Sequence, residues 1–164
     1  MSLSEAEAKL KLSILNSNAI ELDRVDTVAE LTNMGLPQEV ITRIEDLWEK
    51  TKEVGGQIIH IGKVILAEIM KFIKENPNLA VGVAIGAALG ALISLIPFIG
   101  PLLAPLVSVV SMAVGGIAGL RLDRGEEPRD DLIGVTQELI LIAKKFFELF
   151  ANILNALQGE FSQE

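Results

Sequence analysis

Two side chains in the first half of the chain could carry chemistry, His60 and Glu68. His60 is the single histidine, and the chain has no cysteine or tyrosine. If both residues lie on one helix, Gly56 precedes His60 by about one turn, a geometry from which a helix can ligate a porphyrin-type metal. The alternative is a helix histidine that lies near an interface.

Glu68 falls near the apolar face of the same predicted helix. It could be a functional carboxylate in a pore or bundle, or it could pair with Lys71 about one turn away. The sequence contains no phosphate-binding loop, metal-ligand helix or nucleophile motif. We therefore expect a protein that is not an enzyme and that uses no metal and no cofactor.

The charged residues are divided very unevenly along the chain. Residues 76–120 contain no Asp, Glu, Lys, Arg or His, so all charge lies in the two arms, 1–75 and 121–164. The net charge of −8 argues against nucleic acid as a partner and against simple adhesion to anionic lipid. The acidic N-terminus does not resemble a secretory signal peptide. Any membrane targeting must come from the middle.

The uncharged middle predicts a membrane hairpin. Residues 77–96 and 101–120 each offer about 20 uncharged positions, the length that crosses ~30 Å of hydrocarbon. A turn near 97–101 joins them, and its residues are Pro97, Gly100, Pro101 and Pro105. A second helix that starts only after Pro105 would make the hairpin shortened or re-entrant. The alternative is a hairpin buried at the centre of a soluble helical protein.

Small residues recur every four positions along both predicted helices of the hairpin. The first stripe is Gly82, Gly86, Gly90 and Ser94, and the second is Ser111, Gly115 and Gly119. Small residues at this spacing allow two helices to approach closely within lipid, so we expect a homo-oligomer. Lys and Arg flank the hairpin on both sides, which predicts a membrane protein with both termini in the cytoplasm.

The N-terminal arm is expected to form short helices at about 4–15 and 26–34, with a polar break at 16–18 between them. A long helix at about 37–75 follows, because apolar residues alternate at spacings of three and four. Gly55, Gly56 and Gly62 interrupt this pattern and predict a bend.

The C-terminal arm is expected to begin with a charged loop and to continue as an amphipathic helix at about 130–158. Its apolar face is wide, so we expect it to pack against the long N-terminal helix or against other copies. The residues of this face are Leu139, Ile142, Phe146, Phe147, Phe150 and Ile153.

The segment KENPNLAVGVAIGAALGALI, residues 74–93, resembles the C-terminal membrane anchor of YqjD/ElaB-like bacterial inner-membrane proteins. In those proteins an amphipathic region leads through a similar break into a glycine-rich apolar helix. The resemblance implies a bacterial inner-membrane anchor and assigns no functional residue. This chain departs from that pattern because a second apolar segment and a long arm follow.

These observations predict an all-α protein with a membrane hairpin between amphipathic helices. It would act as a self-assembling membrane scaffold or as a pore-forming effector. A second hypothesis is a soluble protein that conceals the hairpin and inserts it on a trigger, by architectural analogy with colicin pore-forming domains and Bcl-2-like proteins. A third is an accessory subunit of a larger membrane complex.

Overall fold

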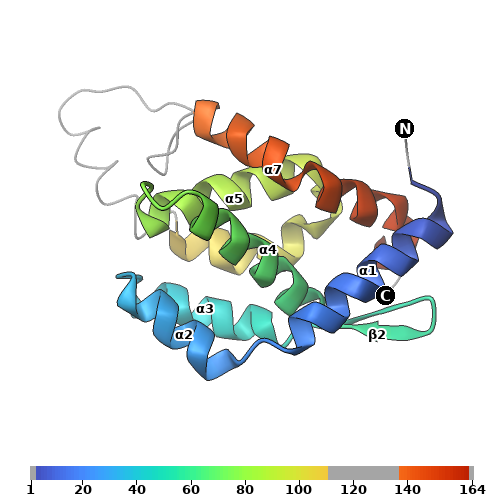
Figure 1. Cartoon of the computed structure of the whole chain (residues 1–164), viewed down its shortest axis with the longest axis horizontal. Helices are drawn as coiled ribbons and strands as arrows, with labels where there is room; N and C mark the ends of the chain where they lie inside the picture. Colours follow the sequence, from blue (N-terminus) through green and yellow to red (C-terminus); the bar gives the residue numbers. More distant parts are fainter. Residues whose placement is uncertain (1–2, 111–136, 163–164) are drawn as a thin grey trace.

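The computed structural model describes residues 3–110 and 137–162, which are mostly helical (Figure 1). This confirms the predicted all-α class, with one small β-hairpin in addition. The helices are α1 (Glu5–Ile20), α2 (Arg24–Asn33), α3 (Gln38–Trp48), α4 (Ile61–Glu75), α5 (Val81–Leu95), the 3-10 turn η1 (Pro97–Ile99), residues 100–110, α7 (Gln137–Ala156) and α8 (Gln158–Ser162).

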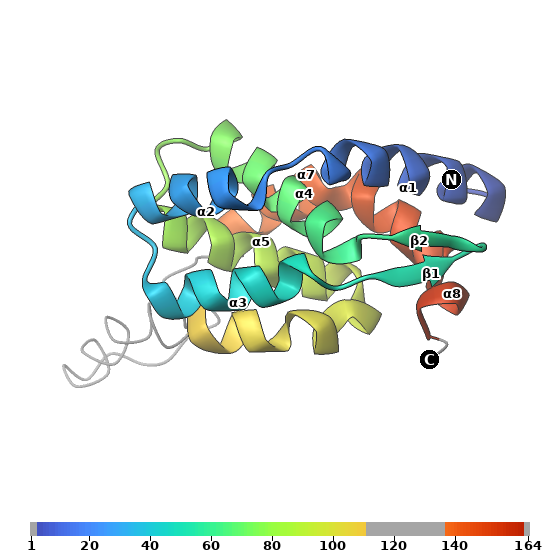
Figure 2. The ribbon, with the colours of Figure 1, turned by 90° about the horizontal axis from the view of Figure 1, so that it is seen from below.

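Helix α5 packs against α4 and α7, and α4 also packs against α1 and α3 (Figures 1 and 2). Helix α1 lies across α4 and α7 and closes one side of the bundle. The β-hairpin and α8 lie together at one end, as Figure 2 shows. The buried side chains of these elements form one continuous apolar core.

The predicted long helix at 37–75 is wrong. Helix α3 ends at Trp48, and a hairpin of strands β1 (Lys52–Val54) and β2 (Gln57–Ile59) separates it from α4. The strands are antiparallel, with Lys52 opposite Ile59. Gly55 and Gly56 form the turn with φ of 58° and 81°, values that glycine adopts without a steric cost. The predicted bend at these glycines is therefore a complete reversal of the chain.

Gly62 has a different role, because it lies where the start of α4 touches the end of α3. Its N–H donates to the Lys50 carbonyl oxygen at 3.1 Å. A Cβ at this position would overlap the Leu47 carbonyl oxygen. The absence of a side chain thus allows α4 to begin directly against α3 after the hairpin.

The predicted break at 16–18 is also wrong, since α1 continues through it to Ile20. Asn16 is only 3 % exposed. Its Nδ2 donates to the Ile58 carbonyl oxygen at 3.3 Å, and its Oδ1 accepts from the His60 N–H at 2.8 Å. A buried amide is tolerated when its donors and acceptors are satisfied. Asn16 therefore joins α1 to β2 and to the residue that precedes α4.

The second predicted helix, at 26–34, corresponds to α2 with a slightly earlier start. Asp23 caps α2 by accepting from the Asp26 N–H at 3.1 Å. After α2, Gly35 adopts a φ of 97°, the left-handed conformation that commonly ends helices. Pro37 then directly precedes α3. Gly35 and Pro37 thus lie at the junction of α2 and α3, with Pro37 in an extended conformation (φ −63°, ψ 153°) before the first helical residue.

We expect Asn16→Ala to lower the free energy of unfolding by about 1–3 kcal/mol, because the Ile58 carbonyl and the His60 N–H lose their buried partner. Urea denaturation followed by circular dichroism measures the change. Asn18→Ala is the matched control, since Asn18 is exposed on the same helix. Equal stability of the two variants would show that the Asn16 contacts contribute nothing.

We expect Gly62→Ala to destabilise the fold by about 3 kcal/mol, because the new methyl group must displace the backbone at Leu47. Gly100→Ala is the control, since Gly100 has helical dihedral angles and open space around a Cβ. Alanine there should leave stability unchanged or raise it by up to about 1 kcal/mol. Thermal melts of both variants give the comparison, and a Gly62→Ala protein as stable as wild type would contradict the close approach.

Candidate functional site: an enclosed apolar helix and its docked tip

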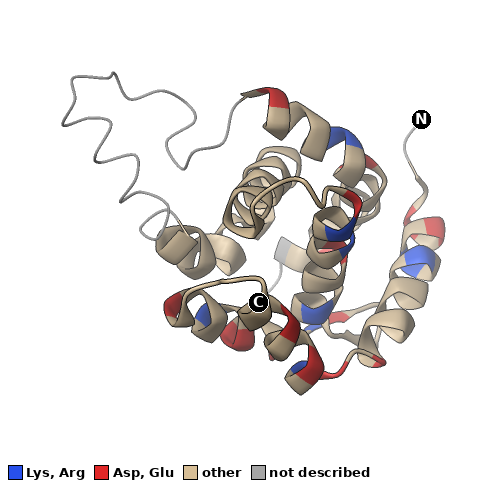
Figure 3. Ribbon diagram, turned by 60° about the vertical axis from the view of Figure 1, so that its left-hand side comes forward, with Lys and Arg blue, Asp and Glu red and all other residues tan. Residues whose placement is uncertain are grey.

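Helix α5 is an uncharged element that packs mainly against α4 and α7. It consists of small and aliphatic residues, and its N-terminal end carries no side-chain cap. Figure 3 shows Lys, Arg, Asp and Glu on the surrounding helices. The buried residues of α5 are Ala84, Ile85, Gly86, Ala87, Ala88, Leu89, Ala91 and Leu92. A helix buried on so many sides is typical of the centre of a helical core.

The first small-residue stripe lies partly against another helix of the same chain. Gly86 is buried, Gly82 and Gly90 are half-buried, and Ser94 is exposed. A Cβ at Gly90 would lie 3.7 Å from the Ile140 side chain of α7. This is an ordinary van der Waals distance, so α7 faces Gly90 but its approach does not require a glycine there. The second stripe, Ser111, Gly115 and Gly119, lies outside the described residues.

The helix of the first predicted span is shorter than its apolar segment. Helix α5 has 15 residues, about 22 Å at 1.5 Å per residue. Residues 77–80 form a turn before it, and Ile96 leaves the helical conformation with φ −131° and ψ 74°. Within the described residues, no helix combines the length and the apolar character needed to cross a bilayer. The predicted helix over 77–96 is thus wrong at both ends.

A turn lies at the position predicted near 97–101, but of its four predicted residues only Pro97 belongs to it, because Gly100, Pro101 and Pro105 lie in the helix that follows. Residues 97–99 form η1, and the next helix begins at Gly100, earlier than the alternative start after Pro105. Ile96 and Ile99 are buried. Pro97, Pro101 and Pro105 are exposed. Ile96 and Ile99 enter the core on one side. The exposed side is formed by Pro97 and by the two prolines of the following helix, and proline has no N–H that needs a partner.

Two contacts fix this turn, which we call the hairpin tip (residues 95–100), to the C-terminal end of the chain. Asn155 Nδ2 donates to the Leu95 carbonyl oxygen at 2.9 Å. That carbonyl belongs to the last turn of α5, where helix carbonyls lack intrahelical partners. The Phe98 ring also packs on Phe161 of α8, with centroids 5.6 Å apart. The end of α7 and the start of α8 thus hold the tip against the bundle.

Sequence reasoning missed Asn155 and Phe161. Asn155 lies outside the apolar stripes of α7, and its partner Leu95 is 60 positions away in the sequence. Phe161 follows the end of the predicted helix. A polar amide beside an apolar face was the available signal, but its partner cannot be identified without the fold.

The predicted C-terminal packing face is confirmed in most positions. Phe147, Phe150 and Ile153 are buried, and Leu139 and Phe146 are half-buried. Ile142 is wrong, since it is 52 % exposed. The Phe146 and Phe147 rings pack on Phe72 of α4 at 5.3 and 5.5 Å. Helix α7 therefore packs against both α5 and α4.

The structure places His60 and Glu68 in different local settings. His60 follows β2 and precedes α4, and Gly56 is in the β-turn, so the predicted one-turn spacing does not exist. Glu68 pairs with Lys71 at 3.5 Å, as one of the two sequence interpretations predicts. Among the described residues, no group of three or more His, Asp or Glu side chains could hold a metal ion.

No protein-family model matches the chain, and comparisons with curated proteins and with solved structures also give no match. The resemblance of residues 74–93 to YqjD/ElaB-like anchors therefore stays a prediction. The candidate site rests on the geometry of α5 and the hairpin tip alone.

We expect Asn155→Ala to loosen the hairpin tip, because the Leu95 carbonyl loses a hydrogen bond worth about 1 kcal/mol. Amide hydrogen exchange should then become several-fold faster at Ile96 and Ile99, while amides in α4 keep their rates. Asn152→Ala is the control, because Asn152 is exposed one turn earlier on α7. Identical exchange at Ile96 and Ile99 in both variants would show that Asn155 does not hold the tip.

Proposed function

We propose that this protein is a non-enzymatic, membrane-inserting protein that conceals its apolar hairpin inside amphipathic helices and transfers it to a lipid bilayer. One observation carries the proposal. A long segment without any charged side chain, residues 76–110 of the described part, is packed among elements that bear all the charge of the described residues.

Transfer of this segment between the protein core and hydrocarbon is physically reasonable. Both environments are apolar, and in α5 the backbone N–H and C=O groups are mostly satisfied within the helix. Moving a charged residue into the bilayer centre would cost several kcal/mol, and this segment has none. Exposure of the same segment to water is unfavourable by ~25 cal/mol per Å² of apolar surface. The bilayer is then the alternative to the protein core.

The hairpin must change shape to span a bilayer. Extension of α5 over 77–96 gives a 20-residue helix of about 30 Å, which matches the hydrocarbon thickness. Pro77 is compatible with the first turn of such a helix. Ile96 would have to become helical, which moves the residues of the hairpin tip. Release of the tip from Asn155 and Phe161 must therefore precede the extension of α5.

A self-assembling scaffold, the other hypothesis for this hairpin, needs the same step. Gly90 packs against Ile140 of α7 in the isolated chain. The small residues of α5 can meet a second copy only after α5 leaves α7. Oligomerisation through the stripe is thus expected in the membrane and not before insertion.

The first test is the state of freshly made protein. We expect it to be recovered without detergent as a monodisperse monomer, because the hairpin is enclosed by charged helices. Cell fractionation followed by size-exclusion chromatography gives the answer. Extraction only by detergent would overturn the concealed state and favour a permanent membrane protein.

The second test locks the hairpin tip. The chain contains no cysteine, so Phe98→Cys, Phe161→Cys can be bridged by a short cleavable linker without side reactions. We expect dye-loaded vesicles to begin leaking at a lower temperature after the linker is cleaved than while it is intact. The physical reason is that a bridged tip cannot leave α8.

The control for the lock is Arg43→Cys, Asp46→Cys, bridged in the same way. These two residues already pair at 3.2 Å within α3, so the bridge joins no separate elements. Cleavage of this linker should leave the onset of leakage unchanged. Absence of leakage from any protein, or one onset for the locked and unlocked tip, would contradict the proposal.

A further inference from the structure

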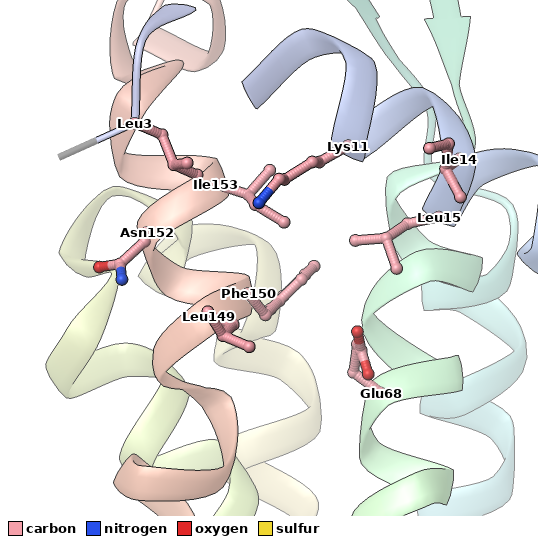
Figure 4. A pocket seen from close by; sticks show the side chains of 9 residues that line it. All are labelled: Leu3, Lys11, Ile14, Leu15, Glu68, Leu149, Phe150, Asn152 and Ile153. Carbon is pink, nitrogen blue, oxygen red and sulfur yellow. The ribbon is translucent and has the colours of Figure 1, made fainter. Parts of the chain in front are cut away.

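A cavity of about 410 Å³ lies between α1, α4 and α7, away from the hairpin tip (Figure 4). Its volume is within the range of small-molecule sites. Leu15 and Phe150 form part of its apolar wall, and Ile14 and Leu149 lie at exposed positions beside it. The full lining is Leu3, Lys11, Ile14, Leu15, Glu68, Leu149, Phe150, Asn152 and Ile153.

Lys11 supplies a positive charge at one side of the cavity. In Figure 4 its side chain extends from α1 toward Ile153 of α7. Among residues 3–110 and 137–162, no ion-pair partner of Lys11 is found. An unpaired ammonium beside an apolar cavity favours a ligand with an anionic group.

Glu68 is the carboxylate of the cavity, and it points inward from α4 (Figure 4). Its charge is opposed by Lys71, whose Nζ lies 3.5 Å from the carboxylate. The lining itself therefore carries one positive charge, from Lys11, and one negative charge, whose lysine partner lies outside the lining. Lys11 is the only cation among the described lining residues.

A second cavity of about 240 Å³ lies at the same α1–α4 boundary and shares Leu15 and Glu68 with the first. Its lining includes the apolar side chains Ala19, Leu22 and Val64 and the charged side chains Lys71 and Lys74. Both cavities beneath α1 are thus mainly apolar with charged groups in their lining. This combination favours an amphiphilic ligand over a compact polar metabolite.

We propose that the larger cavity binds a medium-chain fatty acid, with its carboxylate near Lys11 and its alkyl chain along Leu15, Phe150 and Ile153. The ligand class follows from the apolar lining, the cavity volume and the unpaired ammonium. This site is separate from the hairpin tip, and it requires neither insertion nor a bilayer.

Calorimetric titration with saturated fatty acids of 10, 11 and 12 carbons, each below its micellar concentration, tests the proposal. We expect one saturable site per chain and an affinity that rises up to about fourfold per added CH₂, the factor that corresponds to full burial of that group. Undecyltrimethylammonium, which has the same 11-carbon alkyl chain as dodecanoate and a cationic head, should bind more weakly than dodecanoate. Equal affinities for the two heads, or no saturable binding, would overturn the proposal.

Two charge variants give shifts of opposite sign. Lys11→Gln should weaken dodecanoate binding by about two- to fivefold, the size of a partly exposed ion pair. Glu68→Gln should strengthen it, because a repulsive carboxylate is removed from the wall. Lys145→Gln is the matched control, since Lys145 is exposed on α7 and does not line the cavity. Equal effects at Lys11 and Lys145 would remove the assigned head-group position.

A steric pair tests the position of the alkyl chain. Leu149→Trp adds bulk at the cavity, and it should reduce dodecanoate affinity at least tenfold. Leu141→Trp is its control, because Leu141 is similarly exposed on α7 and lies outside the lining. Circular dichroism establishes folding of both variants, and unchanged binding in Leu149→Trp would contradict the site. Vesicle leakage is measured separately, so failure of this proposal leaves the function of the hairpin tip testable on its own.

Discussion

Helix α5 has no polar face that it can present to water, and this constraint determines how the other helices are arranged. Its buried residues are small or aliphatic, so neighbouring helices can approach closely but gain few directional contacts from it. Helices α4 and α7 pack against this apolar surface, and their charged side chains lie on their outward faces. The fold is thus a charged helical shell that makes an uncharged segment compatible with water.

The positions of the helices relative to one another are specified by a few contacts of polar side chains and glycines, and not by the apolar core itself. Apolar packing is non-directional, so it does not by itself determine where α1 or α4 begins. Asn16 fixes α1 against the end of β2, and Gly62 allows α4 to start against α3. Asn155 fixes the tip of the hairpin. Loss of any one of these contacts affects a junction between elements while leaving most of the core intact.

The sequence predicts the helical class, the boundary between α2 and α3, the position of the hairpin tip and most of the apolar face of α7. These features depend on local signals and on periodicity. It fails at 37–75 because the three-and-four spacing of apolar residues continues through the β-hairpin, and only the positive φ of Gly55 and Gly56 shows the reversal. It fails at Asn16 because an amide typical of a break is also suited to a buried junction. Asn155 and Phe161 could not be predicted as part of the site, since their partners are distant in sequence.

The surroundings of α5 and the space beneath α1 differ in how tightly they are packed. This difference suggests which helix separates from the bundle first. A space of only about 10 Å³ is found where Ile85 of α5 lies near α2, α3 and α4. The larger cavities lie beneath α1, at its boundaries with α4 and α7. Separation of α1 therefore sacrifices fewer close contacts than separation of α5 from its neighbours. Because Lys9 of α1 also pairs with Glu160 of α8 at 3.6 Å, movement of α1 withdraws one support from the helix that holds Phe161. Opening at the loosely packed side of the shell would thus weaken the attachment of the hairpin tip before α5 itself loses its tight packing.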